Sequence, residues 1–398
     1  MTLRISTDTE RFLIVGAGFS GAVLARSLAD AGFHCDVFEE NNHVGGHCHT
    51  ARDRDTGVLV HRQGPHTLHS DDAGVWEFIE QFTTIHPYRH LKRAKVRGEL
   101  YPLPINLQTV NQFFRTALGP NGARAFIEKE AEPFAAQLDG RPPANFEEAG
   151  LAKVGRRLYE AFYRGYTIKQ WGKEPKTLPA SVFSRVPIRF NYDWNYFRHA
   201  RQGQPVGGYT LLVERILAHE NISVHLGRPL SPTEDTSAYR HVFYSGPIDR
   251  FFDWRHGRLP YRTLRFEDVR QHGDVQACDV VNYCDDTDPH TRVTEHKHFS
   301  AGWETHEDTI LSYEYSADCG PDDVPYYPLR LAQDETMLAA YVDAARRMSG
   351  VSFIGRLGTY RYIDMDVAIR EATEAATATA TAIAATTPIP VFFVEPTK

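Results

Sequence analysis

The hydrophobic positions of this chain form their clearest pattern close to the N-terminus. Residues 12–15 are a short apolar run, residues 20–31 carry apolar side chains at helical spacing, and residues 35–38 form a second strand-like run. Short apolar runs suit buried strands, and spacing of three and four suits an amphipathic helix. These segments predict a strand, a helix and a second strand of an α/β unit.

The spacing of the hydrophobic residues changes twice farther along the chain. Residues 109–166 contain three amphipathic helical segments, VNQFFRTAL, ARAFIEKEAEPFAAQL and VGRRLYEAFYRGY. Strand-like segments follow, including VFYSGP, DVVNYC, TRVTEHKHF and TILSYEYS, and their alternation predicts an antiparallel sheet. A last helix should begin near Asp364 and continue through the Ala- and Thr-rich residues 372–387. The segment PIPVFFVEPTK after it is expected to be a loosely held tail.

Composition narrows the class of protein. The chain has 398 residues and a formal net charge of −7, which predicts about two or three folding units and argues against a nucleic-acid partner. No stretch approaches the ~18 consecutive apolar residues of a membrane span, and MTLRISTDTER lacks the apolar core of a signal peptide. We therefore expect a cytoplasmic protein without membrane insertion. Five scattered cysteines without C-x-x-C spacing indicate neither a disulfide framework nor a metal site.

A glycine motif lies between the first strand and the first helix. Gly16, Gly18 and Gly21 form G-x-G-x-x-G. The first glycine permits a tight turn, the second lets the backbone approach a pyrophosphate, and the third lets helix and strand pack closely. Unpaired N–H groups at the helix start, around Phe19 and Ser20, would face the phosphates. With strands on both sides, the motif predicts a dinucleotide site rather than a simple turn.

An acid and a second glycine pair identify the dinucleotide. Glu39 follows the glycines by about 20 residues, where its carboxylate would accept ribose hydroxyls and disfavour a 2′-phosphate. Gly45 and Gly46 come next, and their N–H groups can approach a second phosphate without hindrance. This layout resembles FAD proteins of the amine-oxidase-like and glutathione-reductase-like types. We predict FAD as the cofactor, held by Gly16, Gly18, Phe19, Ser20, Glu39, Gly45 and Gly46.

A longer resemblance covers most of the chain. The strings ELYPLPINLQTVNQFF, GYTIKQWGKEPKTLPASVFSRVPIRFNYDWNYF, QPVGGYT, TRVTEHKHF, PYYPLR and GRLGTYRYIDMD occur in the order seen in bacterial UDP-galactopyranose mutases. The resemblance implies an α/β fold and a homodimer. It implies a discontinuous Rossmann-like FAD-binding domain (1–85, 205–250, 345–398), an inserted small helical domain (108–180) and an antiparallel β-sheet domain (86–107, 181–204, 251–344). The active site would lie in the cleft between them.

The resemblance also implies the chemistry. Members of this family are isomerases that interconvert UDP-galactopyranose and UDP-galactofuranose without net redox change, although their FAD must be reduced. N5 of the flavin attacks the anomeric carbon and expels UDP, after which the opened sugar closes a five-membered ring and UDP returns. We therefore expect a mutase of a nucleotide-diphospho-sugar. The first alternative is the same chemistry on another nucleotide or on a deoxy- or N-acetyl hexose.

The matched strings assign residues to the substrate diphosphate. Arg185 in PASVFSRVP resembles the arginine of the family's mobile loop, and Arg292 in HTRVTEHKHF resembles the fixed one. Each guanidinium offers a planar set of donors to phosphate oxygens, although surface salt bridges are the commoner role of arginine. By position, the hydroxyls that resemble those on the diphosphate belong to Tyr196, Tyr327 and Tyr362.

Further matches surround the nucleotide, the sugar and the flavin. Tyr166 and Phe162 resemble the aromatic wall that stacks on uracil, and Trp171 resembles the tryptophan beside the sugar; packing is the alternative for all three. In QGPHTLHS, two histidines have the spacing of the family's flavin-side segment and could relay a proton or simply bond to backbone. These two histidines, His66 and His69, are assigned to catalysis. Asn282 is assigned to the sugar, and Arg356 and Asp364 are assigned to the cofactor.

Several positions depart from the family pattern, which leaves the sugar and nucleotide open. The departures are His47, Gln63, Leu68, Ser70 and His290. Two other classes of protein are also considered. An FAD oxidoreductase would share the first 50 residues but would not need paired arginines and KQWG in a helical insert. A silent sugar-nucleotide binder could lose its flavin contacts, whereas this chain keeps its glycines and Glu39.

Overall fold

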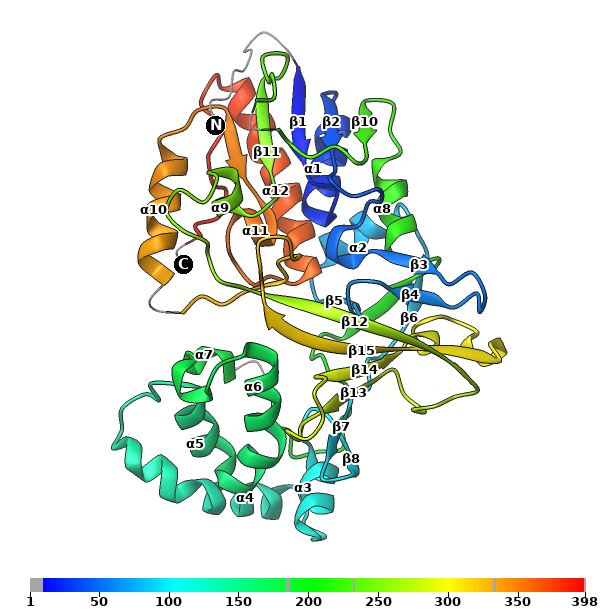
Figure 1. Cartoon of the computed structure of the whole chain (residues 1–398), viewed down its shortest axis with the longest axis vertical. Coiled ribbons are helices and arrows are strands. Elements are labelled where there is room, and N and C mark those ends of the chain that lie inside the picture. The colour runs from blue at the N-terminus through cyan, green and yellow to red at the C-terminus, as the bar shows by residue number, and fades with distance from the viewer. Residues whose placement is uncertain (1–9, 184–186, 232, 332–333, 397–398) are drawn as a thin grey trace.

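A computed structural model describes residues 10–183, 187–231, 233–331 and 334–396. Figure 1 shows three layers along the long axis: a sheet flanked by helices at the top, a long twisted sheet across the middle, and a group of helices below. The upper layer brings together ribbons from the start, the middle and the end of the chain (Figure 1). The predicted α/β fold with a separate antiparallel sheet is therefore confirmed.

The upper sheet consists of five parallel strands in the order β10-β2-β1-β11-β17. They are β1 (Arg11–Val15), β2 (His34–Phe38), β10 (Ile222–His225), β11 (His241–Tyr244) and β17 (Val351–Phe353). Along β1, Phe12 and Ile14 enter one hydrophobic core, and Leu13 and Val15 enter another. Burial on both faces explains why this strand is an unbroken apolar run in the sequence.

Helices cover both faces of the upper sheet. On one face lie α1 (Phe19–Asp30), α2 (Ala73–Glu80), α8 (Tyr209–Leu217) and α12 (Met365–Ala384). On the other lie α9 (Ile248–Phe251) and α10 (Glu335–Arg346), and the short α11 (Gly355–Gly358) follows β17. The expected domain boundary at residue 345 falls inside α10, whose side chains pack on this sheet. None of the helices in the described segments has the length and apolar character needed to cross a membrane.

Two expectations from the sequence are wrong. The segment VFYSGP does not join antiparallel strands, because β11 pairs in parallel with β1 and β17 and is buried on both faces. The segment PIPVFFVEPTK is held rather than loose up to residue 396. The Phe353 N–H donates to the Val391 carbonyl at 2.9 Å, and the Phe392 ring stacks on Phe353 with centroids 5.6 Å apart. Its aromatic residues thereby cover the sheet beside β17.

The middle sheet has seven strands in the order β16-β12-β15-β14-β13-β7-β8. They are β7 (Arg93–Val96), β8 (Glu99–Pro102), β12 (Tyr261–His272), β13 (Val280–Tyr283), β14 (Arg292–Glu295), β15 (Asp308–Asp318) and β16 (Tyr327–Pro328). All neighbours are antiparallel except β13 and β7. Smaller sheets join the layers: β3 (Thr50–Arg52) with β4 (Leu59–His61), and β9 (Arg201–Pro205) with β5 (Leu68–Ser70) and β6 (Ile85–Pro87).

The lower layer consists of α3 (Leu107–Phe114), α4 (Pro120–Ala135), α5 (Phe146–Leu158), a π-helical turn (Tyr159–Arg164), α6 (Gly165–Trp171) and α7 (Ala180–Phe183). Lys169, in the KQWG segment, fixes this layer to the middle sheet. Its ammonium donates to the carbonyls of four residues at 2.7–3.1 Å, namely Tyr283, Asp285, Asp288 and His290. These carbonyls belong to the end of β13 and to the loop between β13 and β14, so α6 is held beside the strands that carry the site.

Candidate functional site

The first glycine motif forms a tight turn between β1 and α1. Gly16 has φ +102°, and a Cβ there would lie 2.2 Å from Ser245 Oγ. A Cβ on Gly21 would lie 1.9 Å from the Gly16 carbonyl oxygen. Both glycines are therefore required by the fold itself.

Gly18 differs from Gly16 and Gly21, because no contact within the described residues requires a glycine there. Its φ is −75°, its ψ is −176°, and the nearest heavy atom to an added Cβ is 3.9 Å away. Any residue can adopt this backbone conformation. The free space lies at the N-terminus of α1, where N–H groups attract an anion. An open position at this point fits a pyrophosphate that passes over the backbone.

The second glycine pair lies against the first motif. The Gly45 N–H donates to the Ala17 carbonyl at 2.9 Å, and a Cβ on Gly46 would lie 3.2 Å from Gly18 Cα. Gly45 and Gly46 also have φ values of +100° and +51°. Segments about 30 residues apart are thus packed backbone to backbone, which lets both expose N–H groups to one ligand.

Glu39 lies at the end of β2, beside the glycine turn. Its carboxylate is buried and accepts from the Ala17 N–H at 2.8 Å and from the Asn41 N–H at 2.9 Å. The Asn41 side chain donates to it as well, at 2.7 Å. A carboxylate has about four acceptor positions, so these bonds fix its orientation and leave room for a ribose hydroxyl.

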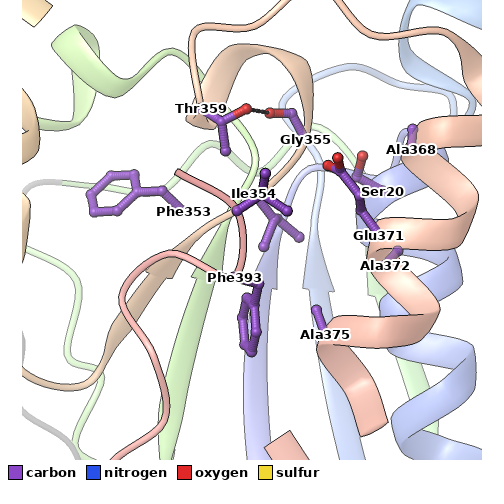
Figure 2. A pocket seen from close by; sticks show the side chains of 11 residues that line it. Ser20, Phe353, Ile354, Gly355, Thr359, Ala368, Glu371, Ala372, Ala375 and Phe393 are labelled. Carbon is purple, nitrogen blue, oxygen red and sulfur yellow. Dashed lines mark hydrogen bonds between the residues drawn. The ribbon is translucent and has the colours of Figure 1, made fainter. Parts of the chain in front are cut away.

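Phe19 and Ser20 contribute backbone rather than side chains to this site. The Phe19 ring is buried against Tyr209, with centroids 6.1 Å apart. Figure 2 shows Ser20 in a small pocket with Gly355 and Glu371, between α1, α11 and α12. A Cβ on Gly355 would lie 2.7 Å from Ser20 Oγ, so this side chain is already enclosed by the protein. Only the N–H groups of the first helical turn remain available to phosphate.

Strand register on the middle sheet builds a second wall of the site. Asn282 on β13 lies opposite Arg292 on β14, and Arg292 lies opposite Glu314 on β15. Directly opposed residues share one face of a sheet. The Arg292 guanidinium is largely buried and contacts Glu314 at 2.6 Å, while Asn282 Oδ1 is buried without a hydrogen-bond partner among the described residues. An orphaned buried amide oxygen on this face is what a ligand-facing residue shows in the absence of its ligand.

The charge on Arg292 is secured by its surroundings. Burial opposes the charged form, but Glu314, Tyr327 and Tyr166 hold the pKa of Arg292 above its usual value. The same burial raises the pKa of Tyr166 and of Tyr327. Near neutral pH the phenols therefore remain O–H donors around a fixed cation.

Arg356 connects this wall with the glycine motifs. Its guanidinium lies 6.0 Å from the centre of the Tyr327 ring and 5.0 Å from that of Tyr362, and it donates to the Ile363 carbonyl at 2.6 Å. It directly follows Gly355, whose backbone contacts Ser20. Arg356 thus lies between Tyr327 and Tyr362 on one side and the turn that encloses Ser20 on the other.

Both predicted catalytic histidines are neutral near neutral pH. His66 Nδ1 lies 2.8 Å from the Gly64 carbonyl oxygen, and burial, with the charge of Arg356, lowers the pKa of His66 to about 4. His69 stacks on Phe197 at 3.6 Å between ring centres, and its Nδ1 lies 2.8 Å from that of His199. Burial also lowers the pKa of His69. Neither imidazole supplies a positive charge, but each offers a donor and an acceptor.

The remaining predicted residues lie in different surroundings. Tyr196 lies beside the same cluster, since Arg292, Tyr362 and Asp364 all act on its pKa, although burial is the largest cause of its rise. Asp364 is exposed just before α12. Phe162 is buried in the core of the helical layer, where its ring centroid lies 5.3 Å from that of Tyr101 and 5.4 Å from that of Phe113, and these are packing contacts.

Trp171 ends α6 and is partly buried against the same helical core. Arg185 lies outside the described residues. The predicted residues that the structure brings to one region are therefore Tyr166, Tyr196, Asn282, Arg292, Tyr327, Tyr362 and Arg356.

Two charged residues of this region could not be recognised from the sequence. Glu314 and Lys92 contribute buried charges to the site, but each lies in a segment without a recognisable motif. Two of the positions that depart from the family pattern meet at Tyr326. His47 stacks on its ring with centroids 4.8 Å apart, and Gln63 accepts a hydrogen bond from its hydroxyl. These two departures therefore share one neighbour, Tyr326.

Comparisons with known proteins identify the relatives of this chain. A family model for UDP-galactopyranose mutase matches residues 161–362, and one for an NAD(P)-binding Rossmann-like domain matches residues 14–82. A probable UDP-galactopyranose mutase of Klebsiella pneumoniae is 46% identical over 97% of this chain and 99% of its own length. A dTDP-fucopyranose mutase of Escherichia coli is 44% identical over 92% of this chain and 97% of its own length.

A solved structure shows the same likeness in three dimensions. A crystal structure of reduced UDP-galactopyranose mutase aligns with a TM-score of 0.75, covering 93% of this chain and 95% of that one. At 18% identity this match concerns the fold. The sequence relatives, which align over nearly their whole length, are those that bear on family membership.

Proposed function

This chain belongs to the UDP-galactopyranose mutase family, and from that premise we propose that it interconverts the pyranose and furanose forms of a nucleotide-diphospho-sugar, with UDP-galactose as the first candidate substrate. The family makes the chain an isomerase and implies a flavin cofactor. The observation that carries the proposal is the buried Arg292, fixed by Glu314 and surrounded by phenol hydroxyls, in one region with the glycine turns.

The cofactor we propose is FAD in its reduced form. Gly18 supports it, because its space is free of protein atoms although the chain could accept a side chain there. Glu39 would orient the ribose, and the N–H groups of Gly45, Gly46 and the first turn of α1 would hold the pyrophosphate. A bound reduced flavin supplies a nucleophile for the anomeric carbon, so the isomerisation needs no net oxidation of the sugar.

Arg292 is the residue we expect to stabilise the departing nucleoside diphosphate. Its guanidinium is held in one orientation by Glu314 before any ligand arrives, so little reorganisation accompanies binding. The hydroxyls of Tyr196 and Tyr327 add hydrogen bonds without adding charge, because burial keeps both phenols protonated. Arg185 would add a second guanidinium.

His66 and His69 would act as neutral imidazoles. Each can accept a proton or a hydrogen bond on one ring nitrogen and donate from the other. In this form they can hold sugar hydroxyls or transfer a proton during ring opening and closure. Asn282 would present its orphaned amide oxygen to a sugar hydroxyl. Together these groups provide polar contacts while the enclosing aromatic rings exclude water.

The identity of the sugar and the nucleotide is tested by a substrate panel. Flavin-loaded protein reduced with dithionite is incubated with UDP-galactopyranose, dTDP-fucopyranose and a GDP-hexose, and furanose products are separated by chromatography. We expect furanose from UDP-galactose or from dTDP-fucose, the substrates in the names of the two relatives. Failure of the reduced, flavin-loaded protein to form furanose from any of them would overturn the proposed function.

A further inference from the structure

Lys92 is a buried cation that the family resemblance does not include. It directly precedes β7 and is 7% exposed. Its ammonium lies 4.1 Å from the centre of the Tyr196 ring. In the segments that the structure describes, the Nζ of Lys92 has no hydrogen bond and no carboxylate partner, and it is not among the fully enclosed polar atoms. An ammonium that has lost most of its hydration and has only an aromatic ring against it lacks a full set of partners, so a role for its charge is expected.

Two carboxylates, Asp279 and Glu314, act to raise the pKa of Lys92, but both already accept hydrogen bonds from other groups. Asp279 accepts from His90 Nδ1 at 2.7 Å, from the Tyr88 hydroxyl and from the Val280 N–H at 2.7 Å. Glu314 accepts from Arg292 at 2.6 Å and from the Thr291 hydroxyl at 3.1 Å. Each carboxylate therefore has closer donors than Lys92. Burial, followed by the charge of Arg292, lowers the pKa of Lys92 to about 7.

Strand register places Lys92 on the same face of the middle sheet as Asn282 and Arg292. Ala94 on β7 lies beside Asn282, and Asn282 lies beside Arg292. Lys92 is two positions before Ala94 and so projects from the same face of the sheet. Two strand spacings, about 10 Å, separate the backbone of Ala94 from that of Arg292, and Lys92 lies two residues farther along the chain. If Arg292 and the Tyr196 hydroxyl bind the diphosphate, then Lys92 and Asn282 lie beside a group attached to the diphosphate, and the sugar is one such group.

We propose that Lys92 is a specificity-determining residue that binds a carboxylate on the sugar, so that the site favours a nucleoside diphosphate hexuronate over the corresponding neutral hexose. This inference rests on the proposed function and deepens it. The ammonium and the orphaned Asn282 oxygen form a donor and acceptor pair on one face, which matches the two kinds of oxygen on a uronic acid ring. A carboxylate at this point would give the buried ammonium the partner that the chain does not supply.

The test compares two ligands that differ only at C6 of the sugar. Dissociation constants of UDP-galacturonate and UDP-galactose are measured by titration calorimetry on flavin-loaded wild-type and Lys92→Met protein. Lys92→Met should raise the dissociation constant of UDP-galacturonate about 30-fold and that of UDP-galactose less than about threefold, because only the uronate loses a charge-assisted hydrogen bond. The matched control is Lys95→Met on the opposite face of β7, which should leave the ratio of the two constants unchanged.

The result can overturn the inference without touching the proposed function. If both ligands bind equally more weakly to the variant, Lys92 contacts the diphosphate. If neither ligand binds more weakly, Lys92 is a packing residue. Either result refutes the inference. Turnover of a neutral NDP-hexose by reduced wild-type protein is scored separately. If the reduced protein forms furanose but its preference for the uronate does not depend on Lys92, only this inference is refuted and the proposed function stands.

A second measurement covers the case in which Lys92→Met does not fold. The ratio of the two constants is measured for the wild type at pH 6 and pH 9. The charged and titratable groups that face Lys92 differ from it in pKa. The pKa of Arg292 is raised, that of Tyr196 is raised, that of His90 is lowered and that of Asp279 is about 2. Glu314 is paired with Arg292. Loss of the ammonium charge at the higher pH should reduce the preference for the uronate by at least about tenfold. A ratio that does not change would refute the inference.

Discussion

Gly18→Ala is expected to leave the fold intact and to remove the flavin. The backbone at Gly18 is in the extended region, and an added Cβ would meet no protein atom closer than 3.9 Å. The methyl group would instead occupy the space through which a pyrophosphate must pass. Overpacking of this kind costs about 1–3 kcal/mol, so retention of flavin should fall about tenfold or more, and activity with it.

The matched control is Gly119→Ala. Gly119 is also an N-cap residue, with φ −74° and ψ 174°, and an added Cβ would have no atom within 4 Å. Both variants lose the same N-cap preference, so both should show the same small fall in Tm. The ratio of flavin to protein absorbance should fall only for Gly18→Ala. If both variants keep their flavin, the pyrophosphate does not cross the backbone at Gly18.

Loss of Arg292 is expected to reduce kcat/KM by at least about 10²-fold, because a fixed cation at a departing diphosphate acts mainly in the transition state. Removing Arg292 alone would leave Glu314 as an unpaired buried charge, at a cost of about 3–5 kcal/mol in stability. The variant to measure is therefore the double substitution R292M/E314Q, which removes both charges of the pair. Its fold can be checked by near-UV circular dichroism and flavin content.

Two single variants complete this experiment. Glu314→Gln keeps the guanidinium and should lose activity much less than the double variant, since a neutral amide can still accept from Arg292. Arg265→Met on the exposed face of β12 removes a charge from the same sheet and should leave kcat/KM within about twofold. A double variant that retained near-wild-type kcat/KM would show that the diphosphate is bound elsewhere.

Local patterns predicted the cofactor side of the molecule. The turn at Gly16, the start of α1 and the carboxylate at Glu39 lie within one short stretch of chain, and each follows from backbone geometry. The sequence could not reveal that Gly18 and Gly46 pack together, because that contact depends on how two turns meet in space. It also did not distinguish the packing role of Phe162 from a binding role, since both need an aromatic residue on a helix.

The residues of the proposed substrate site are brought together by the pairing of strands that lie far apart in the sequence. Arg292 stood in a recognisable string, but its partner Glu314 is set by the register of β14 and β15, and register follows from the whole sheet. Lys92 stands in the sequence between Leu91 and Arg93, in a segment rich in basic residues, and resembles a solvated lysine. Only the folded chain shows its burial against Tyr196. The C-terminal tail was misjudged because PIPVFFVEPTK lacks a periodic pattern, whereas burial of Phe392 against Phe353 needs none.

The most direct test of the central claim follows one substrate through a redox cycle of the flavin. A single preparation is assayed for conversion of UDP-galactopyranose, or of the best substrate from the panel, in the oxidised state, after reduction with dithionite, and after reoxidation by air. The account predicts furanose formation at least about 10²-fold faster in the reduced state, loss of activity on reoxidation, and no consumption of reductant in proportion to product. Turnover at the same rate by the oxidised protein, or one equivalent of reductant consumed per product, would contradict it.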